Sequence, residues 1–322
     1  MTYKVLCTDG LSKRGVERLS KFAGVETDFR PKLTHEELLD AIPAFDGLIV
    51  RSASKVGSDV IERAGKLKIV ARAGVGVDNI DVKAATERGI LVVNTPAGNT
   101  TATCELTFTM MLSLARHVPQ AAKLMTEGVW EKKKFMGTEL SRKTLGIVGM
   151  GRIGKEVARR AKAFDMKILA MDPYLTDDAY ASLGVEKAGL ERILKEADYL
   201  TVHTPLTDET RNLIGAKQFA MMKPTAYVVN CARGGIINER DLAEALRSNT
   251  IAGAALDVYT KEPYEDTIFR GLDNAILTPH LGASTREAQD AVAVEAAEAV
   301  GGYLTKGTRM NAVNPQVPER RA

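Results

Sequence analysis

The sequence has little of what several classes of protein require. Its 322 residues carry 44 basic and 41 acidic side chains, so the formal net charge is only +3. No basic stripe with interleaved aromatic residues appears, and nucleic-acid binding is therefore not indicated. No segment contains the roughly 18 to 20 uninterrupted apolar residues that a membrane helix needs, and no secretory signal follows Met1. We therefore expect a cytoplasmic protein with neither a membrane nor a nucleic acid as partner.

Cysteine and histidine are scarce as well. The three cysteines, Cys7, Cys104 and Cys231, lie far apart in apolar surroundings. An odd number of separated cysteines does not suggest a disulfide framework, so we expect reduced packing residues. The four histidines show no ligand spacing, and we expect no metal site.

Short apolar runs alternate with amphipathic helical patterns along the chain. Repeated strand–helix units of this kind predict parallel sheets covered by helices on both faces. A long helical pattern over 100–118 separates a first series from a second, which predicts two α/β domains with a cleft between them. The spacing alone does not decide whether the last helix, over 287–304, belongs to the second domain or returns to the first. The predicted strands lie within 3–8, 47–52, 67–74, 89–95, 145–149, 166–173, 197–205, 226–235, 251–259 and 274–282.

A glycine-rich motif begins the second series. Gly149, Gly151 and Gly154 form G-x-G-x-x-G between a strand-like run and a helical pattern, as in loops that bind a pyrophosphate. The next strand-like run ends at Asp172, and 172 − 154 = 18 agrees with the roughly 20 residues expected for an acid that binds ribose. A carboxylate there would repel a 2′-phosphate, and residues 173–175 offer no cation to neutralise one. The motif therefore predicts NAD rather than NADP.

Several polar residues close the strand-like runs of the second series. Open parallel sheets bind ligands beyond the carboxyl ends of their strands, so we expect these residues around one crevice. Among them, Arg233 is followed by two glycines. The arginine suits a small anion, although the residues alone equally allow a loop cap formed by local hydrogen bonds. The set comprises Thr204, Pro205, Cys231, Ala232, Arg233, Gly234, Asp257 and His280.

Two histidines end strands of the second series. His203 precedes a Thr-Pro pair and suits a structural or cofactor-facing role. His280 ends the last strand-like run, and Glu262 lies 280 − 262 = 18 residues earlier, in the preceding loop. If folding brings these two together, the carboxylate fixes the imidazole tautomer and leaves the other ring nitrogen as a general acid or base. The alternative is a core histidine and a surface glutamate.

Four motifs in order, "GMGRIGKEVA", "NCARGG", "ALDVYTKEP" and "TPHLGAST", resemble the D-2-hydroxyacid dehydrogenase family. Within it, "VNTPAGNTTATCELTF", "GVWEKKKFMGTEL" and "NCARGGIINE" are similar to members whose substrate is a phosphorylated 2-hydroxyacid. The resemblance runs from about Tyr3 to Asn314 and covers the catalytic portion of such enzymes, without a C-terminal regulatory domain. It implies an α/β fold of two doubly wound parallel-sheet domains. A Rossmann NAD domain at 99–285 is inserted into a flavodoxin-like substrate domain made of 1–98 and 286–322, to which the last helix returns.

The resemblance also implies how the site works. Arg233, Glu262 and His280 form the catalytic trio, in which the arginine holds the substrate carboxylate and carbonyl while the imidazole moves the hydroxyl proton. NAD accepts the hydride. We expect the cofactor to contact Gly149, Gly151, Arg152, Ile153, Gly154, Asp172, Thr204, Pro205, Cys231, Ala232, Asp257, Gly282 and Ala283. We expect the substrate to contact Arg51, Arg72, Gly74, Val75, Gly76, Asn99, Arg233 and His280.

A substrate phosphate needs cations, which the first series supplies. By the resemblance Arg51 and Arg72 face the substrate; as an alternative, either one ties loops together. Asn99 is a further polar contact or a helix cap. Two positions depart from the family pattern. Val75 stands where close relatives often carry a threonine near the nicotinamide, and Lys132 replaces an arginine thought to reach a neighbouring subunit's site.

Other interpretations stay open. A glyoxylate or hydroxypyruvate reductase would share the catalytic trio. A NAD-sensing interaction protein, similar to the transcriptional corepressors of the family, would share the scaffold. The helix over 102–114 and Trp130 resemble the family's dimer contact, so we expect a homodimer or homotetramer. The alternative for that helix is an internal core position.

Overall fold

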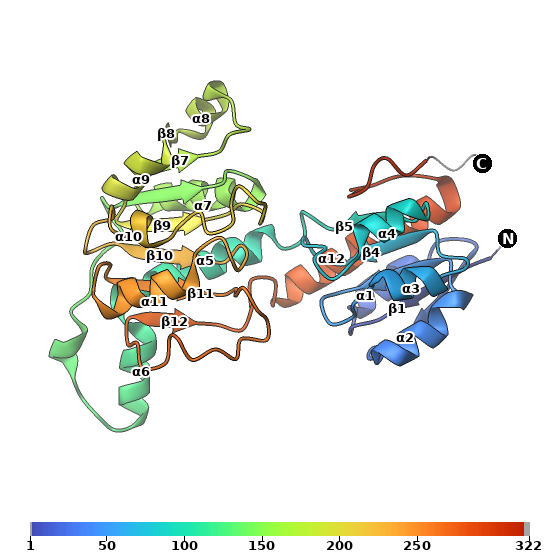
Figure 1. Ribbon diagram of the computed structural model, residues 1–322, viewed down its shortest axis with the longest axis horizontal. Helices are drawn as coiled ribbons and strands as arrows, with labels where there is room; N and C mark the ends of the chain where they lie inside the picture. The colour runs from blue at the N-terminus through green and yellow to red at the C-terminus, as the bar shows by residue number, and fades with distance from the viewer. Residues whose placement is uncertain (1, 319–322) are drawn as a thin grey trace. The chain divides into compact units, whose positions relative to one another are not determined.

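The computed structural model describes residues 2–318. The chain forms two compact units, one made of residues 2–99 and 283–318 and the other of Thr100–Gly282 (Figure 1). The expected boundaries were 98/99 and 285/286, whereas the structure divides the chain at 99/100 and 282/283, so Asn99 and residues 283–285 lie in the first unit rather than the second. The roles expected for the two domains stay predictions.

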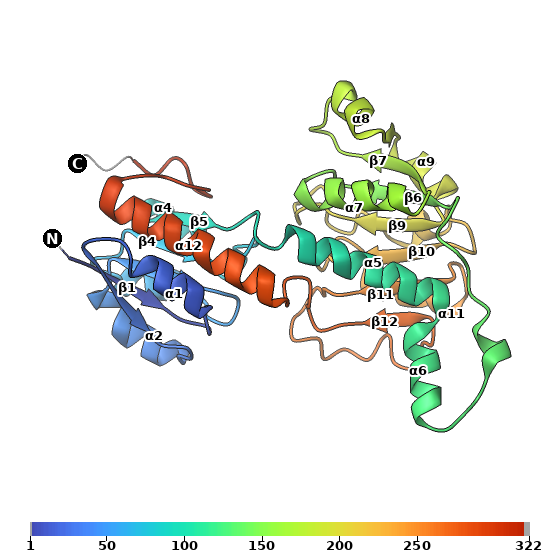
Figure 2. The ribbon, with the colours of Figure 1, turned by 180° about the vertical axis from the view of Figure 1, so that it is seen from behind.

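The first unit is built on a five-stranded parallel sheet. Its strands are β1 (Tyr3–Cys7), β2 (Val25–Phe29), β3 (Gly47–Val50), β4 (Ile69–Arg72) and β5 (Leu91–Asn94). Its helices are α1 (Lys13–Leu19), α2 (His35–Ala41), the 3-10 helix η1 (Ile42–Ala44), α3 (Ser58–Arg63), α4 (Val82–Glu87) and α12 (Arg286–Lys306). The strand order β2-β1-β3-β4-β5 is that of flavodoxin-like sheets. Helices α1 and α12 cover one face (Figure 2), and α2, α3 and α4 cover the other.

Both faces of this sheet are buried. Val5 and Cys7 belong to the core cluster under α12, whereas Leu6 between them belongs to the opposite cluster. Successive strand residues point to opposite faces, so a strand covered on both sides needs apolar residues throughout. This is why the central strands appear in the sequence as continuous apolar runs.

The second unit is built on a seven-stranded parallel sheet. Its strands are β6 (Thr144–Val148), β7 (Lys167–Met171), β8 (Glu186–Lys187), β9 (Tyr199–Val202), β10 (Tyr227–Asn230), β11 (Gly253–Leu256) and β12 (Ala275–Leu277). Its helices are α5 (Thr100–Arg116), α6 (Val118–Thr126), η2 (Lys132–Phe135), α7 (Arg152–Ala163), α8 (Asp177–Leu183), α9 (Leu190–Glu196), α10 (Ala216–Phe219) and α11 (Glu239–Arg247). The order β12-β11-β10-β9-β6-β7-β8 is the Rossmann order with one added strand. Helices α5 and α7 pack on one face and α9, α10 and α11 on the other, and the predicted α/β fold with two doubly wound sheets is confirmed.

The long helix predicted over 100–118 ends two residues earlier than predicted and is followed by a second helix. It ends at Arg116, because His117 has a left-handed φ of 52°, and α6 then begins with Pro119 in its first turn. A proline is tolerated there because first-turn N–H groups have no helical partner. Residues of α5 such as Phe108 and Met111 are buried in the core of the second unit. One face of α5 is therefore an internal core face, whereas Thr101, Glu105, Thr109 and Leu112 are exposed, and the dimer contact expected at 102–114 stays a prediction.

Two further findings concern residues 2–318. None of their helices is both long and apolar enough to cross a membrane. No group of three or more His, Cys, Asp or Glu side chains among them is arranged to hold a metal ion.

Candidate active site

The second unit carries its predicted site residues at one edge of the sheet. Because neighbouring strands are parallel, their carboxyl ends lie at the same edge. The acid–base candidates follow the strands at one end of this row, and the predicted ribose acid follows the strand at the other end. A dinucleotide laid across the carboxyl edge requires this arrangement. Along β12-β11-β10-β9-β6-β7 the residues are, in turn, His280, Asp257, Arg233, Thr204, Gly149 and Asp172.

Each glycine of the loop between β6 and α7 meets a different requirement. Gly149 has a φ of +97°, and a Cβ there would lie 2.6 Å from the carbonyl oxygen of His203. A Cβ on Gly151 would meet nothing within 4 Å. A Cβ on Gly154 would lie 2.1 Å from the carbonyl oxygen of Gly149, so helix and turn are in close contact. A tight turn, an open approach and close helix packing are the features of a pyrophosphate-binding loop.

Helix α7 begins at this loop with Gly151 as its N-cap, and no side chain among the described residues caps it. The first N–H groups of a helix have no partner within the helix, and they attract an anion. Arg152 is exposed in this first turn, and Ile153 is partly buried. These residues fit the pyrophosphate of a dinucleotide.

Asp172 is tied to the glycine loop. Its Oδ2 accepts a hydrogen bond from the N–H of Met150 at 2.7 Å, and its Oδ1 accepts one from the N–H of Tyr174 at 2.9 Å. The hydroxyl of Tyr180 accepts from the Asp172 N–H at 2.6 Å. Each carboxylate oxygen has two lone pairs, so each can still accept a bond from a ribose hydroxyl.

Further predicted cofactor contacts lie between these ends of the row, among them Thr204, Pro205 and Cys231. The hydroxyl of Thr204 donates to the carbonyl oxygen of Pro205 at 2.9 Å. Cys231 is buried, and burial raises the pKa of its thiol to about 12. The thiol is thus an uncharged packing group rather than a nucleophile.

Glu262 and His280, which the sequence left either paired or apart, are in contact in the structure. His280 Nδ1 lies 2.7 Å from Glu262 Oε2. An ionised carboxylate can only accept, so Nδ1 carries the proton, and in the neutral imidazole the free lone pair is then on Nε2. Glu262 Oε1 accepts from the N–H of Tyr259 at 3.0 Å, so both carboxylate oxygens are held. The imidazole is 48% exposed and open to a substrate, and its catalytic role stays a prediction.

Asp257 holds the turn that carries His280. This fully buried carboxylate accepts through Oδ1 from the hydroxyl of Thr278 at 2.6 Å and from the N–H of Leu281 at 2.7 Å. Its Oδ2 accepts from the N–H of Gly282 at 2.8 Å. Cofactor contacts are predicted for Asp257 and Gly282, but nothing in the sequence indicates this anchoring.

Arg233 lies in the loop between β10 and α11. Its Nη1 donates to the carbonyl oxygen of the preceding Ala232 at 2.6 Å. The next residue, Gly234, makes a close approach: a Cβ there would lie 1.9 Å from the carbonyl oxygen of Tyr259. The loop that carries Arg233 therefore packs directly on the loop that carries Glu262.

The first unit gathers the predicted phosphate-binding residues at the carboxyl edge of its own sheet. Arg51 follows β3, and Arg72 ends the neighbouring β4. Arg51 Nη1 donates to the carbonyl oxygen of Asp9 at 3.3 Å, and burial lowers the pKa of the guanidinium. Arg51 does tie loops together, and its fork has further N–H donors. The Arg72 guanidinium lies across Gly74, where a Cβ would fall 1.3 Å from Nη1.

The remaining predicted contacts in this unit are partly buried, like Arg51 and Arg72. Val75 and Gly76 are partly buried, and the carbonyl oxygen of Val75 accepts from Asn94 Nδ2 at 2.6 Å. Asn99 Oδ1 is buried and has no hydrogen-bond partner among residues 2–318. The carbonyl oxygen of Ala283 accepts from Gln289 at 2.6 Å.

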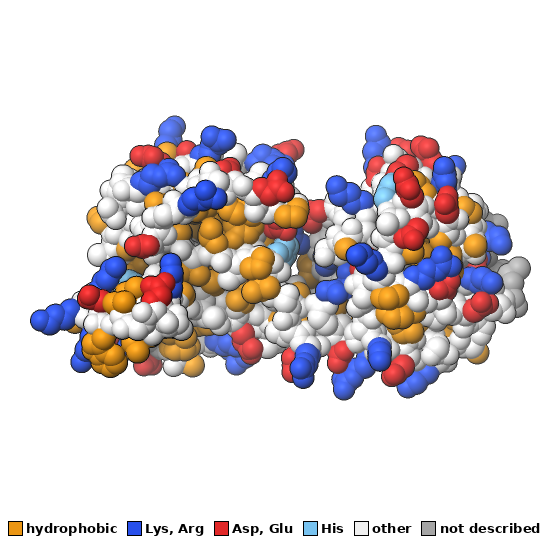
Figure 3. All heavy atoms as spheres, turned by 90° about the horizontal axis from the view of Figure 1, so that it is seen from below, with side chains coloured by type: hydrophobic (Ala, Val, Ile, Leu, Met, Phe, Trp, Pro, Cys, Tyr) orange, Lys and Arg blue, Asp and Glu red, His pale blue; other side chains and the backbone are white. Residues whose placement is uncertain are grey.

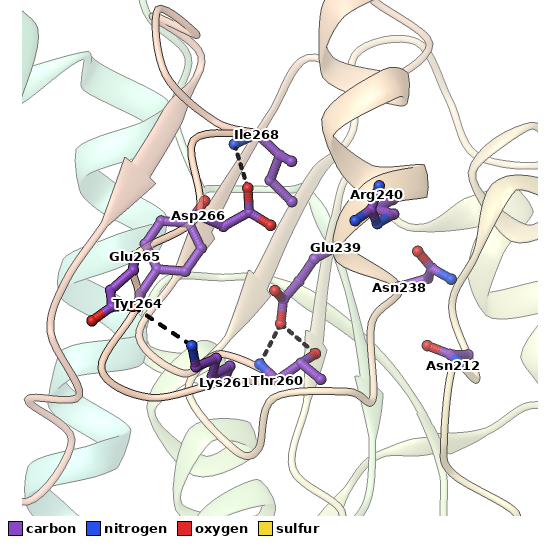
Figure 4. A pocket seen from close by; sticks show the side chains of 10 residues that line it. All are labelled: Asn212, Asn238, Glu239, Arg240, Thr260, Lys261, Tyr264, Glu265, Asp266 and Ile268. Atoms are coloured by element: carbon purple, nitrogen blue, oxygen red, sulfur yellow. Dashed lines mark hydrogen bonds and ion pairs between the residues drawn. The ribbon is translucent and has the colours of Figure 1, made fainter.

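A pocket of about 560 Å³ lies elsewhere on the second unit (Figure 4). It is formed by the start of α11 and the segment that follows β11. The glycine loop and His280 are not part of its lining, so it is not the predicted dinucleotide site. The lining residues are Asn212, Asn238, Glu239, Arg240, Thr260, Lys261, Tyr264, Glu265, Asp266 and Ile268.

Comparison with known proteins identifies the class. Residues 108–282 match the family model "D-isomer specific 2-hydroxyacid dehydrogenase, NAD binding domain". This match covers more than half of the chain, which therefore belongs to the D-isomer specific 2-hydroxyacid dehydrogenase family. The second unit contains the family's NAD binding domain.

Three individual proteins show how far the likeness extends. A D-3-phosphoglycerate dehydrogenase from Synechocystis sp. is 48% identical over 311 residues, which are 97% of this chain and 56% of that relative. The structure of NAD+-bound 3-phosphoglycerate dehydrogenase from Entamoeba histolytica has a TM-score of 0.82 at 28% identity, and the match covers 98% of this chain and 99% of that one. A glyoxylate reductase from Paecilomyes thermophila has a TM-score of 0.87 at 29% identity, with coverage of 98% and 100%.

These comparisons have two consequences. The TM-scores of the two solved structures are alike although their named activities differ, so the fold does not identify the substrate. The chain spans 56% to 61% of the length of the curated relatives it matches.

Proposed function

We propose that this chain oxidises 3-phospho-D-glycerate to 3-phosphohydroxypyruvate with NAD, the first step of the phosphorylated route to serine. The observation that carries the proposal is the His280–Glu262 contact of 2.7 Å at the same sheet edge as Arg233 and the glycine loop. The 48% identity to a relative named D-3-phosphoglycerate dehydrogenase supports the choice of substrate.

Each residue of the trio has one task in this proposal. Glu262 holds His280 Nδ1–H, so Nε2 accepts the proton of the C2 hydroxyl. Arg233 binds the substrate carboxylate with the two parallel hydrogen bonds of its fork and polarises the C2 oxygen in the reverse direction. NAD, when bound, supplies the hydride acceptor. Gly149, Gly151 and Gly154 hold its pyrophosphate, and Asp172 holds its ribose.

The phosphate of the substrate needs charges that the trio does not supply. We assign this task to Arg51 and Arg72, with the backbone N–H groups of 74–76 beside them. Both arginines stand at the ends of adjacent strands, which supports a shared task. The Arg72 guanidinium lies over Gly74, which supports a site that combines this arginine with the neighbouring backbone N–H groups.

We also assign this chain to the cytoplasm and to a homodimer or homotetramer. Three free, buried thiols support a reducing compartment. Exposed apolar side chains on and after α6 support pairing: Val118, Met125, Trp130 and Met136 are 53%, 54%, 78% and 84% exposed. The surface on the α6 side of the second unit, with its hydrophobic side chains, is visible in Figure 3.

The substrate assignment is tested by following NADH formation with 3-phospho-D-glycerate, D-glycerate and D-lactate side by side. Arg51→Ala should lower kcat/KM for phosphoglycerate by about 10-fold to 100-fold, since a lost hydrogen bond between charged groups costs about 1.5–3 kcal/mol. Its effect on D-glycerate, which lacks the phosphate, should be small. The matched control is Arg63→Ala, an exposed arginine of the same unit that pairs with Asp40.

Three outcomes contradict the proposal in different ways. Equal losses on both substrates would remove the phosphate-binding role of Arg51. A preference for reducing glyoxylate or hydroxypyruvate would favour the sister reductase. NADH binding without oxidation of any 2-hydroxyacid would favour a non-enzymatic, NAD-sensing protein.

A further inference from the structure

The loop that carries Glu262 is also hydrogen-bonded to a carboxylate that is not part of the proposed trio. Glu239 is the first residue of α11, which begins shortly after the loop of Arg233. Its Oε1 accepts from the N–H of Thr260 at 2.5 Å and from the Thr260 hydroxyl at 2.7 Å. Figure 4 shows these two bonds at the rim of the pocket. Thr260 stands two residues before Glu262.

Tyr259, the residue before Thr260, ties the same loop to Glu262 and to Thr278. Its N–H donates to Glu262 Oε1 at 3.0 Å, and its hydroxyl donates to the carbonyl oxygen of Thr278 at 2.9 Å. Tyr259 is buried and stacks on Tyr264 at 4.4 Å between ring centroids. Residues 260–263 are all exposed, so packing does little to fix them. After the contacts of Tyr259, the two Thr260 bonds are therefore the second set of interactions that fixes the position of residues 260–263.

We infer that Glu239 is a positioning residue, which acts through Thr260 to hold Glu262 at hydrogen-bond distance from His280. This inference rests on the proposed function, in which Glu262 and His280 form the acid–base pair. A substitution far from the reacting atoms that displaces a catalytic group by about 1 Å can lower the rate about 100-fold. Loss of the two Thr260 bonds next to Glu262 is therefore expected to lower the rate measurably. No other acid within residues 2–318 bonds to Thr260.

A purely structural role makes a different prediction. An acid in the first turn of a helix also stabilises the helix dipole, and that effect would appear in stability alone. The exposed pair Lys261–Glu265, at 3.5 Å with side chains 82% and 74% exposed, contributes little to holding the loop. The test must therefore separate loop position from helix stability.

The experiment compares Glu239→Ala and Glu239→Gln with Glu244→Ala in the full chain. Glu244 lies on the same helix, is 75% exposed and pairs with Arg247 at 3.9 Å. Glu239→Ala should lower kcat by about 10-fold to 100-fold and leave KM for NAD unchanged. Glu239→Gln keeps an oxygen for Thr260 and should recover most of the rate. Glu244→Ala should stay within about 2-fold of the unchanged protein, as a surface substitution does.

A double-variant cycle shows whether Glu239 acts through Glu262. In a Glu262→Gln background, Glu239→Ala should cost little more, because coupled residues are not additive. A full additional loss in that background would overturn the inference, and so would an unchanged kcat in Glu239→Ala. If Glu239→Ala fails to fold, Thr260→Val removes the hydroxyl bond and keeps the N–H bond, so it should give a smaller loss of kcat that likewise disappears in the Glu262→Gln background, and an unchanged kcat would overturn the inference.

A spectroscopic signal separates this inference from the proposed function. The ¹⁵N shift of His280 Nδ1, identified by its loss in His280→Gln, reports the contact with Glu262 whether or not the chain turns over any substrate. The shift in Glu239→Ala should move toward that of Glu262→Gln. An unmoved shift would overturn the inference, whereas an inactive chain with a moved shift would overturn only the proposed function.

Discussion

The buried carboxylate of Asp257 decides where His280 lies. His280 has a left-handed φ of 56°, a conformation that costs about 1–2 kcal/mol for a residue other than glycine. Asp257 binds Thr278 on one side of it and Leu281 and Gly282 on the other. Charge-assisted hydrogen bonds are stronger than neutral ones, so the three together hold the turn in this conformation.

A single buried imidazole, that of His203, should make the stability of the folded chain depend on pH. Its Nε2 lies 3.0 Å from the hydroxyl of Thr201, and burial lowers the pKa of the imidazole to about 4. The unfolded chain takes up the proton below about 6.5, whereas the folded chain does so only near 4. The stability due to neutral His203 is thus complete above about 6.5 and is lost as the pH falls toward 4.

The test compares urea unfolding of the unchanged protein and His203→Gln between pH 7 and pH 4.5. The unchanged protein should lose about 2 kcal/mol more than the variant over this range, since one pKa unit corresponds to about 1.4 kcal/mol. Parallel curves would show that His203 titrates normally in the folded state.

The sequence identified some of these residues and not others for a physical reason. The contact between His280 and Glu262 could be anticipated because His280 is one of four histidines and both residues lie beside strand ends, where parallel sheets gather ligands; their acid–base role stays a prediction. The hydrogen-bond partners of Asp257 and Glu239 could not be predicted. Their partners are backbone N–H groups and threonine hydroxyls, which nearly every segment contains, so only the fold determines which donor meets which carboxylate.

At the scale of elements, two loops of the second unit pack against each other, and they touch at Gly234. One loop runs from β10 to α11 and carries Arg233, and the other follows β11 and carries Glu262. A Cβ on Gly234 would lie 1.9 Å from both the carbonyl carbon and oxygen of Tyr259. Main-chain atoms cannot move aside as the end of a side chain can, so any larger residue must push the two loops apart.

Gly234→Ala should therefore separate Arg233 from Glu262. We expect kcat/KM to fall by about 100-fold and the free energy of unfolding to fall by about 1–3 kcal/mol, the usual cost of overpacking. Steady-state kinetics and urea unfolding measure the two effects. Gly189→Ala is the control, because a Cβ there would meet nothing within 4 Å. Unchanged kinetics in Gly234→Ala would mean that the loops need not touch.

The buried strands were predictable, whereas two exposed edge strands, β2 and β8, were not. All the central strands appear as apolar runs because helices cover both faces. The edge strand β2 has the sequence VETDF and the two-residue β8 is Glu-Lys, and most of their side chains are partly or fully exposed. These two strands pair with a neighbour on one side and bury little apolar surface, so they leave no apolar pattern in the sequence, unlike the edge strands β5 and β12.

At the scale of the whole molecule, each unit has its own core on both faces of its own sheet. Helix α6 is different, because it has no buried residues, and the segment after it carries the most exposed apolar side chains of that region. Trp130 is 78% exposed. Covering an aromatic side chain of about 150–250 Å² is worth several kcal/mol at about 25 cal/mol per Å², so this surface favours association.

The oligomer is tested by sedimentation equilibrium of the unchanged protein and of Trp130→Ser combined with Met136→Ser. We expect the unchanged chain to sediment at twice or four times its own mass. The double variant should dissociate to smaller species at concentrations at least about 100-fold higher, since every 1.4 kcal/mol is worth tenfold. Phe29→Ser is the control, because Phe29 is an exposed apolar residue on β2 of the other unit. A monomeric unchanged protein, or a variant that associates as tightly, would show that α6 and the segment after it do not form the subunit contact.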